Sequence, residues 1–278
     1  MIQAIQPPSA CPLCGGAAFE KTFTYTAQPS GEIRFAFSST GSYLRQVFTC
    51  RGCGHMLSLH DMDEKELYAG DYVESTYGRD GLKRSFDRIN ALDPANSDNV
   101  GRVMRVNEFA RALLPQSAYR DRQPTVLDIG SGLCVFLYRM KAVGWDGTAL
   151  DPDERAVQHA REVVGVKAVC ADFLEADDLG KFDLITFNKV LEHVKDPVFM
   201  LARSCDFLAP GGLIYVELPD GEAALHEGFE REEFFIEHHH VFSAASIALL
   251  ARRAGFRICL IERLREPSTK FTLRAFLQ

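Results

Sequence analysis

Between residues 125 and 278, short runs of β-type apolar residues alternate with longer stretches whose apolar positions have helical spacing. The short runs predict strands near 125–129, 147–150, 167–170, 182–187, 212–218, 257–263 and 270–277. The longer stretches predict helices near 133–143, 153–164, 197–208 and 243–254. Such alternation is typical of a Rossmann-like α/β fold, with a doubly wound, mostly parallel seven-stranded sheet and helices on both faces.

The first 60 residues follow a different pattern, in which two Cys-x-x-Cys motifs flank β-type stretches at 19–26 and 43–48. Each motif is followed by glycine, and the two are near copies of each other. Two such knuckles can hold one ion in a tetrahedral thiolate site, whereas disulfide bonds or a redox motif do not explain matched copies. The pattern predicts a zinc-ribbon-like module whose structural zinc is held by Cys11, Cys14, Cys50 and Cys53.

The stretch between these regions is acidic and turn-rich at 61–97, with tyrosines at positions 68, 72 and 77. A helix is predicted from about Asp98 to Leu114, ended by Pro115. We therefore expect three domains: a zinc-binding module at 1–60, a linker and helical cap over the active site at 61–124, and a cofactor-binding domain at 125–278.

Composition narrows the class of protein. The chain has 46% hydrophobic residues, a net charge of −7 and a pI near 5.7, which argues against nucleic-acid and membrane-surface partners. No apolar run approaches the roughly 20 residues needed to span a bilayer, and the N-terminus lacks signal-peptide features. Four further cysteines are scattered through apolar stretches, as suits a reducing compartment. We expect a cytoplasmic protein.

The segment 125–134, TVLDIGSGLC, predicts a buried strand that runs into a glycine turn and then a helix. Gly130 and Gly132 let the backbone approach a ligand, and the helix N-terminus directs free N–H groups toward it. Asp128 lies at the end of the strand. This loop predicts a nucleotide-type cofactor.

Two further strand ends carry acidic residues suited to the same ligand. Asp151 follows Gly132 by 19 residues, the spacing expected of a carboxylate that accepts the ribose hydroxyl protons. Asp172 and Phe173 end the third strand, where they suit an amino-group acceptor and an apolar wall against a purine. These features fit either NAD or S-adenosylmethionine.

In combination, these segments resemble the class I S-adenosylmethionine-dependent methyltransferases over about residues 100–278. The matching segments also include Phe182-Asp-Leu-Ile, Asn188-Lys-Val-Leu-Glu-His-Val, Leu208-Ala-Pro-Gly-Gly-Leu and the terminal strand pair, an antiparallel hairpin in that family. The resemblance implies that the methionine end contacts the glycine turn, the ribose the second strand and the adenine the third. The cofactor-binding residues it implies are Asp128, Gly130, Gly132, Asp151, Asp172, Phe173 and Asn188.

Cys134 stands where many members of that family have a third glycine. A dinucleotide pyrophosphate would need that close approach more than S-adenosylmethionine does. The departure therefore favours the methyltransferase over the nicotinamide-dependent oxidoreductase.

The paired knuckles resemble those of a subfamily with an N-terminal zinc-binding region, typified by deoxysugar C-methyltransferases that act on nucleotide-linked keto-sugars. In that subfamily an N-terminal tyrosine and a Tyr-x-Glu-His segment line the active site. Glu237 and His238 match this segment, but Phe235 replaces its tyrosine, so the hydroxyl role is missing. The resemblance implies a small, sugar-linked acceptor.

Methyl transfer is an in-line displacement that can require removal of one proton from the acceptor. The candidate catalytic residues are His238, Glu237, His193 and Tyr77. A hydrogen bond within its own loop is an equal alternative for His193, and ordinary packing is one for Tyr72 and Tyr77. Residues 238–240 are three consecutive histidines, which cannot all face one ion in regular structure, so we expect no second metal there.

The leading hypothesis is an S-adenosylmethionine-dependent methyltransferase acting on a small metabolite. An RNA methyltransferase with a zinc-ribbon reader, a nicotinamide-dependent oxidoreductase and a non-catalytic binding protein are the alternatives. The RNA alternative is weak because residues 1–60 have a small basic excess. That excess comes from Lys21, Arg34, Arg45 and Arg51 against Glu20 and Glu32.

Overall fold

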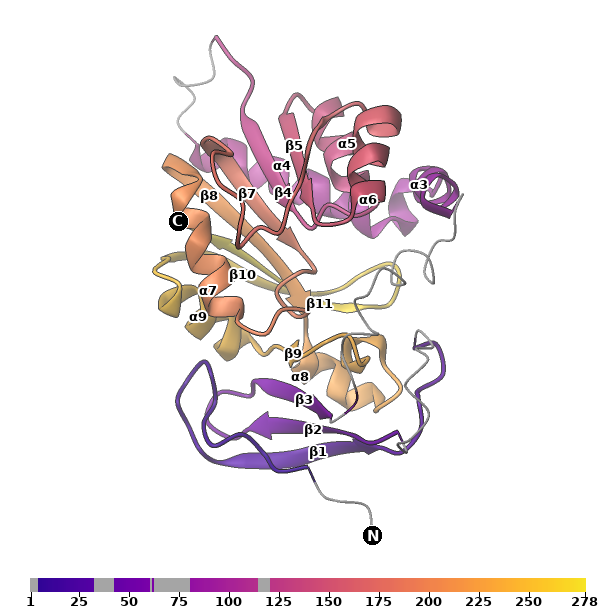
Figure 1. Ribbon diagram of the computed structural model, residues 1–278, viewed down its shortest axis with the longest axis vertical. Helices are drawn as coiled ribbons and strands as arrows, with labels where there is room; N and C mark the ends of the chain where they lie inside the picture. Colours follow the sequence, from indigo (N-terminus) through magenta and orange to yellow (C-terminus); the bar gives the residue numbers. More distant parts are fainter. Residues whose placement is uncertain (1–4, 33–42, 61, 63–80, 115–120) are drawn as a thin grey trace.

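The computed structural model describes residues 5–32, 43–60, 62, 81–114 and 121–278, and a seven-stranded sheet forms its central layer (Figure 1). The strand order is β10-β11-β8-β7-β4-β5-β6. The pairs from β6 to β8 are parallel, whereas β11 is antiparallel to both of its neighbours. The strands are β4 (Thr125–Ile129), β5 (Asp146–Asp151), β6 (Lys167–Cys170), β7 (Phe182–Asn188), β8 (Leu208–Pro219), β10 (Ile258–Arg265) and β11 (Phe271–Leu277). The predicted doubly wound sheet and terminal hairpin are therefore confirmed.

Helices cover both faces of this sheet. On one face α4 (Asp98–Leu113) packs against α5 (Val135–Ala142), next to α6 (Glu154–His159), which continues as a π-helical turn over residues 160–164. On the other face α7 (Pro197–Arg203) packs against α9 (Ala244–Arg253). Two separate hydrophobic clusters result, one on each side of the sheet.

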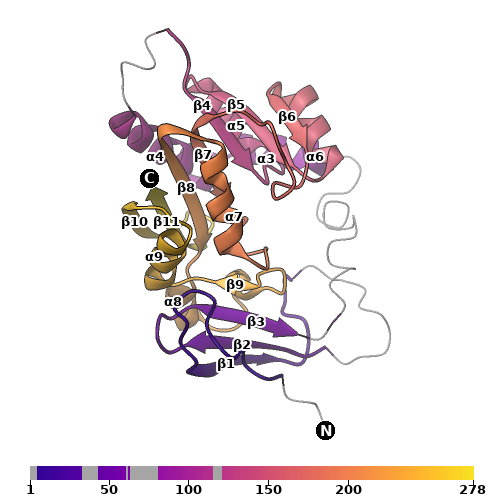
Figure 2. The same cartoon turned by 60° about the vertical axis from the view of Figure 1, so that its left-hand side comes forward.

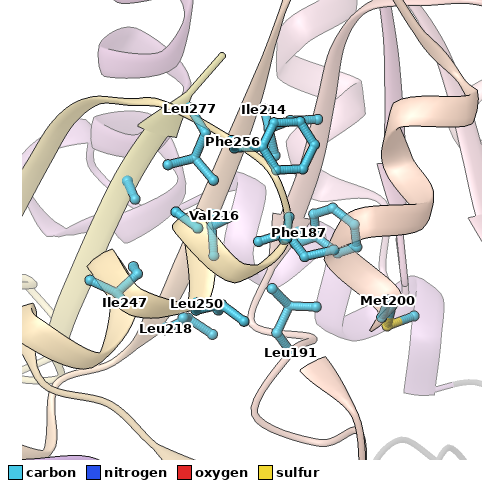
Figure 3. Close-up of a cluster of buried hydrophobic side chains, with 14 of the residues drawn as sticks. Phe187, Leu191, Met200, Ile214, Val216, Leu218, Ile247, Leu250, Phe256 and Leu277 are labelled. Carbon is cyan, nitrogen blue, oxygen red and sulfur yellow. The ribbon is translucent and has the colours of Figure 1, made fainter. Parts of the chain in front are cut away.

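The side chains of β8 contribute alternately to the two hydrophobic clusters. Leu213 and Tyr215 pack in the cluster under α4 and α5, while Ile214, Val216 and Leu218 pack in the cluster under α7 and α9 (Figure 3). Because successive side chains of a strand point to opposite faces, an almost continuous apolar run is needed for burial on both sides. The sequence of β8 meets that need.

A second, four-stranded sheet contains the N-terminal region, in the order β1-β2-β3-β9. Strands β1 (Phe19–Tyr25), β2 (Arg45–Cys50) and β3 (Met56–His60) pair antiparallel, which agrees with the small sheet expected there. The fourth strand, β9 (His240–Val241), comes from the far end of the chain and pairs with β3. Both views place α8 (Gly221–Ala224) and the edge strand β9 on the side of the small sheet that faces the seven-stranded sheet (Figures 1 and 2).

The helix α3 (Gly81–Asn90) lies in the segment that was expected to be turn-rich. Its residues are mostly polar, and its one buried aromatic ring, Phe86, packs edge-on against Tyr138 of α5 and His159 of α6. Tertiary packing therefore stabilises a helix that local propensity leaves undecided. Across the described ranges, no helix combines the length and apolarity that crossing a bilayer requires.

Candidate functional site

The four cysteines of the two knuckles lie together at one end of the small sheet. Their sulfur atoms all lie within 4.8 Å of one another, with 3.7 Å from Cys11 Sγ to Cys53 Sγ and 3.5 Å from Cys14 Sγ to Cys50 Sγ. A tetrahedral zinc site with Zn–S bonds of about 2.3 Å has sulfurs about 3.8 Å apart. The four thiols form no disulfide bonds, so they are available as metal ligands. Their spacing fits a zinc ion.

Glycines explain how the two knuckles approach so closely. A Cβ atom on Gly16 would lie 3.2 Å from Cys14 Sγ, and one on Gly52 would lie 3.4 Å from the same sulfur. The backbone N–H of Gly16 donates to Cys14 Sγ over 3.3 Å and lowers the pKa of that thiol, which favours the thiolate that a metal binds.

The glycine turn follows β4 as predicted. Gly130 and Gly132 have φ angles of 66° and 47°, and a Cβ atom on Gly132 would meet nothing within 4 Å. Cys134 retains the left-handed backbone, with φ of 57°, that a third glycine would adopt freely. Its side chain is buried in the cluster under α5, which accounts for a non-glycine residue there.

Asp128 and Asp151 hold the two strand ends beside this turn. Asp151 Oδ2 accepts the Gly132 N–H over 2.8 Å, and its Oδ1 accepts the Asp153 N–H over 2.9 Å. Asp128 Oδ1 accepts from Thr186 Oγ1 over 2.6 Å and from Asn188 Nδ2 over 2.7 Å. Burial raises the pKa of Asp128 to about 6, against the effect of these hydrogen bonds.

Unpartnered polar atoms mark the space beside the turn. The buried Oδ1 of Asn188 and the buried Oγ of Ser131 lack a hydrogen-bond partner in the described part of the chain. Buried polar groups are normally paired, so these two atoms are suited to the amino and carboxylate groups of a bound amino-acid moiety. Together with the open space above Gly132, they fit the methionine end of S-adenosylmethionine.

The predicted adenine residues have different surroundings. Asp172 Oδ1 accepts the Leu174 N–H over 2.8 Å in a local turn after β6, and the residue is exposed. Phe173 is only 2% exposed and packs against Phe187 and Phe207 in the core. The expectation of a Phe173 ring facing the purine therefore needs correction, because this ring stabilises the core.

A cavity of about 300 Å³, the strand-end pocket, lies beyond the carboxyl ends of β7 and β8. Its walls come from the β7 end, the β8 end, the loop at 232–238 and the start of β11. The lining residues are Lys189, Glu192, His193, Pro219, Glu232, Glu233, Phe235, Glu237, His238, Lys270 and Phe271. The structure thus brings together His193, Glu237 and His238, three of the four predicted catalytic residues, whereas Tyr77, like Tyr72, lies outside the described residues.

Both pocket histidines are oriented by main-chain carbonyls. His193 Nδ1 lies 2.8 Å from the Glu237 carbonyl oxygen, and His238 Nδ1 lies 2.9 Å from that of Glu233. A proton on each Nδ1 leaves each Nε2 as a hydrogen-bond acceptor. Burial lowers the pKa of His193 to about 4 and lowers that of His238 well below its usual value, so both imidazoles are neutral at pH 7.

His240 has a different role from His238. Its Nδ1 lies 3.0 Å from Nε2 of His55, the two rings stack, and both are buried. His240 therefore belongs to the small sheet, where its ring packs against that of His55. In the strand-end pocket, the group with metal-ligand spacing combines Glu192 and His193 with His238, one of the three consecutive histidines.

Two further pocket residues were not among the candidate catalytic residues from sequence. Glu192 is fully buried with no hydrogen-bond partner for either carboxylate oxygen among the described residues, and burial raises its pKa to about 8. Lys189 adopts a left-handed backbone with φ of 58° and donates its N–H to the Glu217 carbonyl. Strain in a non-glycine residue often marks a functional site. The only signal in the sequence is their place in the segment 188–194.

Comparison with known proteins identifies the family. A model described as a methyltransferase domain matches residues 102–260, more than half of the 278 residues. The chain belongs to this methyltransferase-domain family, which confirms the predicted class of S-adenosylmethionine-dependent methyltransferases.

Curated relatives match over shorter lengths. A ubiquinone biosynthesis O-methyltransferase of Caulobacter vibrioides is 35% identical over 99 residues, which are 33% of this chain and 39% of that protein. One from Bordetella avium is 27% identical over 139 residues, which are 48% of this chain and 54% of that protein. The chain thus spans about half or less of the length of these relatives.

Solved structures share the fold. The 1,6-didemethyltoxoflavin-N1-methyltransferase of Burkholderia thailandensis, with bound 1,6-didemethyltoxoflavin and S-adenosylhomocysteine, has a TM-score of 0.52 at 17% identity. That match covers 90% of this chain and 98% of the other. Magnesium protoporphyrin IX methyltransferase of Synechocystis PCC 6803, with bound S-adenosylhomocysteine, has a TM-score of 0.54 at 17% identity and covers 76% and 98%.

Proposed function

We propose that this protein transfers the methyl group of S-adenosylmethionine to a small molecule bound in the strand-end pocket. One observation carries the proposal: the pocket begins at Lys189, directly after Asn188, whose unpartnered oxygen lies at the cofactor end of β7. An acceptor in the pocket would therefore lie beside the methionine end of the cofactor. Such proximity converts methyl transfer into an effectively unimolecular step.

The cofactor would be held by the residues around the glycine turn. Asp128, Gly130, Gly132 and Asn188 would hold the methionine end and Asp151 the ribose, while Asp172 would accept from the adenine amino group. When bound, S-adenosylmethionine supplies an electrophilic methyl group on a sulfonium. The chain's own residues must align the acceptor with that methyl group and remove its proton.

His238 is the proposed proton acceptor. The acceptor atom forms a bond to the methyl carbon, the sulfonium–methyl bond breaks with its electron pair left on sulfur, and the acceptor proton passes to His238 Nε2. A neutral imidazole can take this proton. Glu237, whose pKa burial raises to about 7, and His193 line the same pocket and would orient the acceptor.

The proposed acceptor is a nucleotide-linked sugar or a related glycan or natural-product precursor. The Cys-x-x-Cys pair and the Glu237-His238 segment support this substrate class through the resemblance already described. Phe235 lines the pocket without a hydroxyl group, so the proposed reaction does not use the tyrosine of that subfamily. The curated relatives are named O-methyltransferases, and the test must include hydroxyl acceptors.

The basic residues of the small sheet give little support to the RNA alternative. Arg45 is fully buried against Glu32, and Arg51 Nη2 lies 3.4 Å from Glu20 Oε2. These ion pairs neutralise two of the four basic side chains of residues 1–60. We therefore keep the proposal of a small-molecule acceptor and a structural zinc ion.

Turnover assays test the proposed function. Purified protein is incubated with S-adenosylmethionine and a panel of nucleotide sugars and phenols, and S-adenosylhomocysteine formation is measured. We expect turnover with one class and a fall of at least about 100-fold in His238→Gln, as for loss of a general base. The control His226→Gln changes an exposed histidine. Near-normal turnover in His238→Gln would remove this residue as the base.

A further inference from the structure

A buried ion pair joins the small sheet to the loop that carries Glu237 and His238. Arg45 Nη2 of β2 lies 3.0 Å from Glu32 Oε1, and both side chains are fully buried. Tyr43 OH donates to Glu32 Oε2 over 2.8 Å and accepts from Arg45 Nε over 3.1 Å. The guanidinium also stacks 4.0 Å above the Tyr25 ring. The pair is thus held rigidly from within the N-terminal region.

Both members of the pair reach across to the loop backbone. Arg45 Nη1 donates to the Phe234 carbonyl oxygen, and Glu32 Oε1 accepts the Ile236 N–H over 2.7 Å. These two contacts hold the backbone on either side of Phe235, and the second is made by Ile236, the residue directly before Glu237. Hydrogen bonds to charged groups are stronger than neutral ones, so the pair fixes this segment firmly.

The small sheet also holds the loop beyond its histidine. Ser58 of β3 donates its N–H to the His239 carbonyl over 3.1 Å, and Leu57 pairs with His240 in the β3–β9 ladder. The residues Glu237 and His238 are therefore fixed on both sides by contacts from residues 32–60. Between these contacts, the two side chains face the strand-end pocket.

We propose that Glu32 and Arg45 are positioning residues that set the orientation of Glu237 and His238 toward the acceptor. The proposal rests on the proposed function of the strand-end pocket. A buried ion pair adds little net stability relative to a hydrophobic substitute, because both charges lose their hydration. Its two main-chain contacts with the loop give it a specific role, namely to fix geometry on which an in-line transfer depends.

The test uses the full chain with Arg45→Lys, which keeps the charge but loses the planar fork that contacts Glu32 and Phe234 together. The matched control is Arg51→Lys, whose ion pair with Glu20 lies on the surface of the same sheet, with side chains 66% and 63% exposed. Three quantities are measured: amide hydrogen exchange over residues 234–241, the imidazole NMR shifts of His238, and S-adenosylhomocysteine affinity.

We expect Arg45→Lys to speed amide exchange over 234–241 by about tenfold and to move the His238 shifts, with cofactor affinity unchanged within about twofold. Once an acceptor has been identified, kcat/KM for that acceptor should fall by at least about tenfold in Arg45→Lys. Arg51→Lys should leave all of these as in the wild type. Unchanged exchange and unchanged His238 shifts in Arg45→Lys would overturn the proposal, as would altered exchange with normal acceptor kinetics.

A second variant serves as the test if Arg45→Lys does not fold. Arg45→Met combined with Glu32→Gln removes both charges, so no unpaired charge stays buried, and Gln retains an acceptor for Ile236. The same exchange and NMR changes are expected. Absence of turnover with every acceptor in the wild type would count against the proposed function alone, because exchange and NMR shifts report the loop without turnover.

Discussion

Single residues around the glycine turn show which parts of the cofactor site depend on one side chain. Asp151 is the clearest case, since its two carboxylate oxygens already order Gly132 and Asp153 and retain lone pairs for a ligand. The sequence spacing predicted its place at the strand end. The unpartnered oxygen of Asn188 could not be predicted, because it depends on which neighbours the fold supplies.

Replacing Asp151 by Ala should weaken S-adenosylhomocysteine binding by about 10- to 100-fold, the effect of losing hydrogen bonds to a charged group. Isothermal titration calorimetry measures the affinity. Asp151→Asn keeps an acceptor for the Gly132 N–H and separates loss of the turn from loss of the ligand contact. The control Asp177→Ala changes a side chain that is 86% exposed. Unchanged affinity in Asp151→Ala would contradict the ribose role.

Glu192 makes stability depend on pH. Burial raises its pKa from the usual 4.5 to about 8, so the folded state keeps a proton that the unfolded state releases. The free energy of unfolding contributed by this group is complete below about pH 4.5 and falls as pH rises toward about 8. Glu237, with a pKa raised to about 7, acts in the same direction.

Urea unfolding at pH values between about 5 and 8 measures this dependence. Glu192→Gln cannot ionise, so its stability should fall less steeply with rising pH than that of the wild type. Glu175→Gln alters an exposed carboxylate and should retain the wild-type slope. Equal slopes in Glu192→Gln and the wild type would show that Glu192 is ionised in the folded state.

At the scale of elements, local pattern predicted most of the fold. The strands and helices of residues 125–278, and α4, have strong apolar periodicity, and each was placed within a few residues. Ser243 caps α9 in a reciprocal capping box with Ser246, a local signal at the start of this helix. The main elements missed were α3, β3 and β9. Their stability comes from partners distant in sequence, such as β3 for the two residues of β9.

The same limit applies to the strand-end pocket and its supports. His193, Glu237 and His238 could be chosen from sequence because they follow a strand or match a motif. In the sequence, Arg45 and Glu32 cannot be distinguished from ordinary surface charges. Only the fold shows that they are buried together. Periodicity identifies apolar faces, whereas burial of a charge depends on a partner that local sequence does not specify.

At the scale of the whole molecule, a zinc ion would stabilise the knuckles directly and the residues next to the strand-end pocket only through their contacts with the knuckles. Ser243 Oγ donates to the Cys53 carbonyl oxygen over 2.6 Å, so a knuckle contacts the start of α9 directly. Loss of the metal should loosen the knuckles first, since metal binding in such sites is part of the folding free energy. Within the described residues, the N–H hydrogen bonds of the cofactor turn between β4 and α5 go to β5 and to the turn itself and not to the knuckle cysteines.

We therefore expect about one zinc ion per chain by mass spectrometry of metals. Chelation should lower the melting temperature and speed amide exchange over residues 50–60 and 238–243. S-adenosylhomocysteine affinity should change much less than exchange in these segments. A fully folded protein without bound metal, with exchange unchanged at both segments, would rule out the structural zinc.

The β3–β9 pairing also bears on how the chain is made. About 180 residues separate His60 from His240, so the ribosome adds β9 roughly 10 to 40 s after β3 at usual elongation rates. During that interval no other strand among the described residues pairs with the edge of β3 that later pairs with β9. Unpaired strand edges favour association between chains. Nascent molecules on the same messenger RNA are therefore exposed to edge-to-edge aggregation, and shielding of β3 by a chaperone would benefit the yield of folded protein.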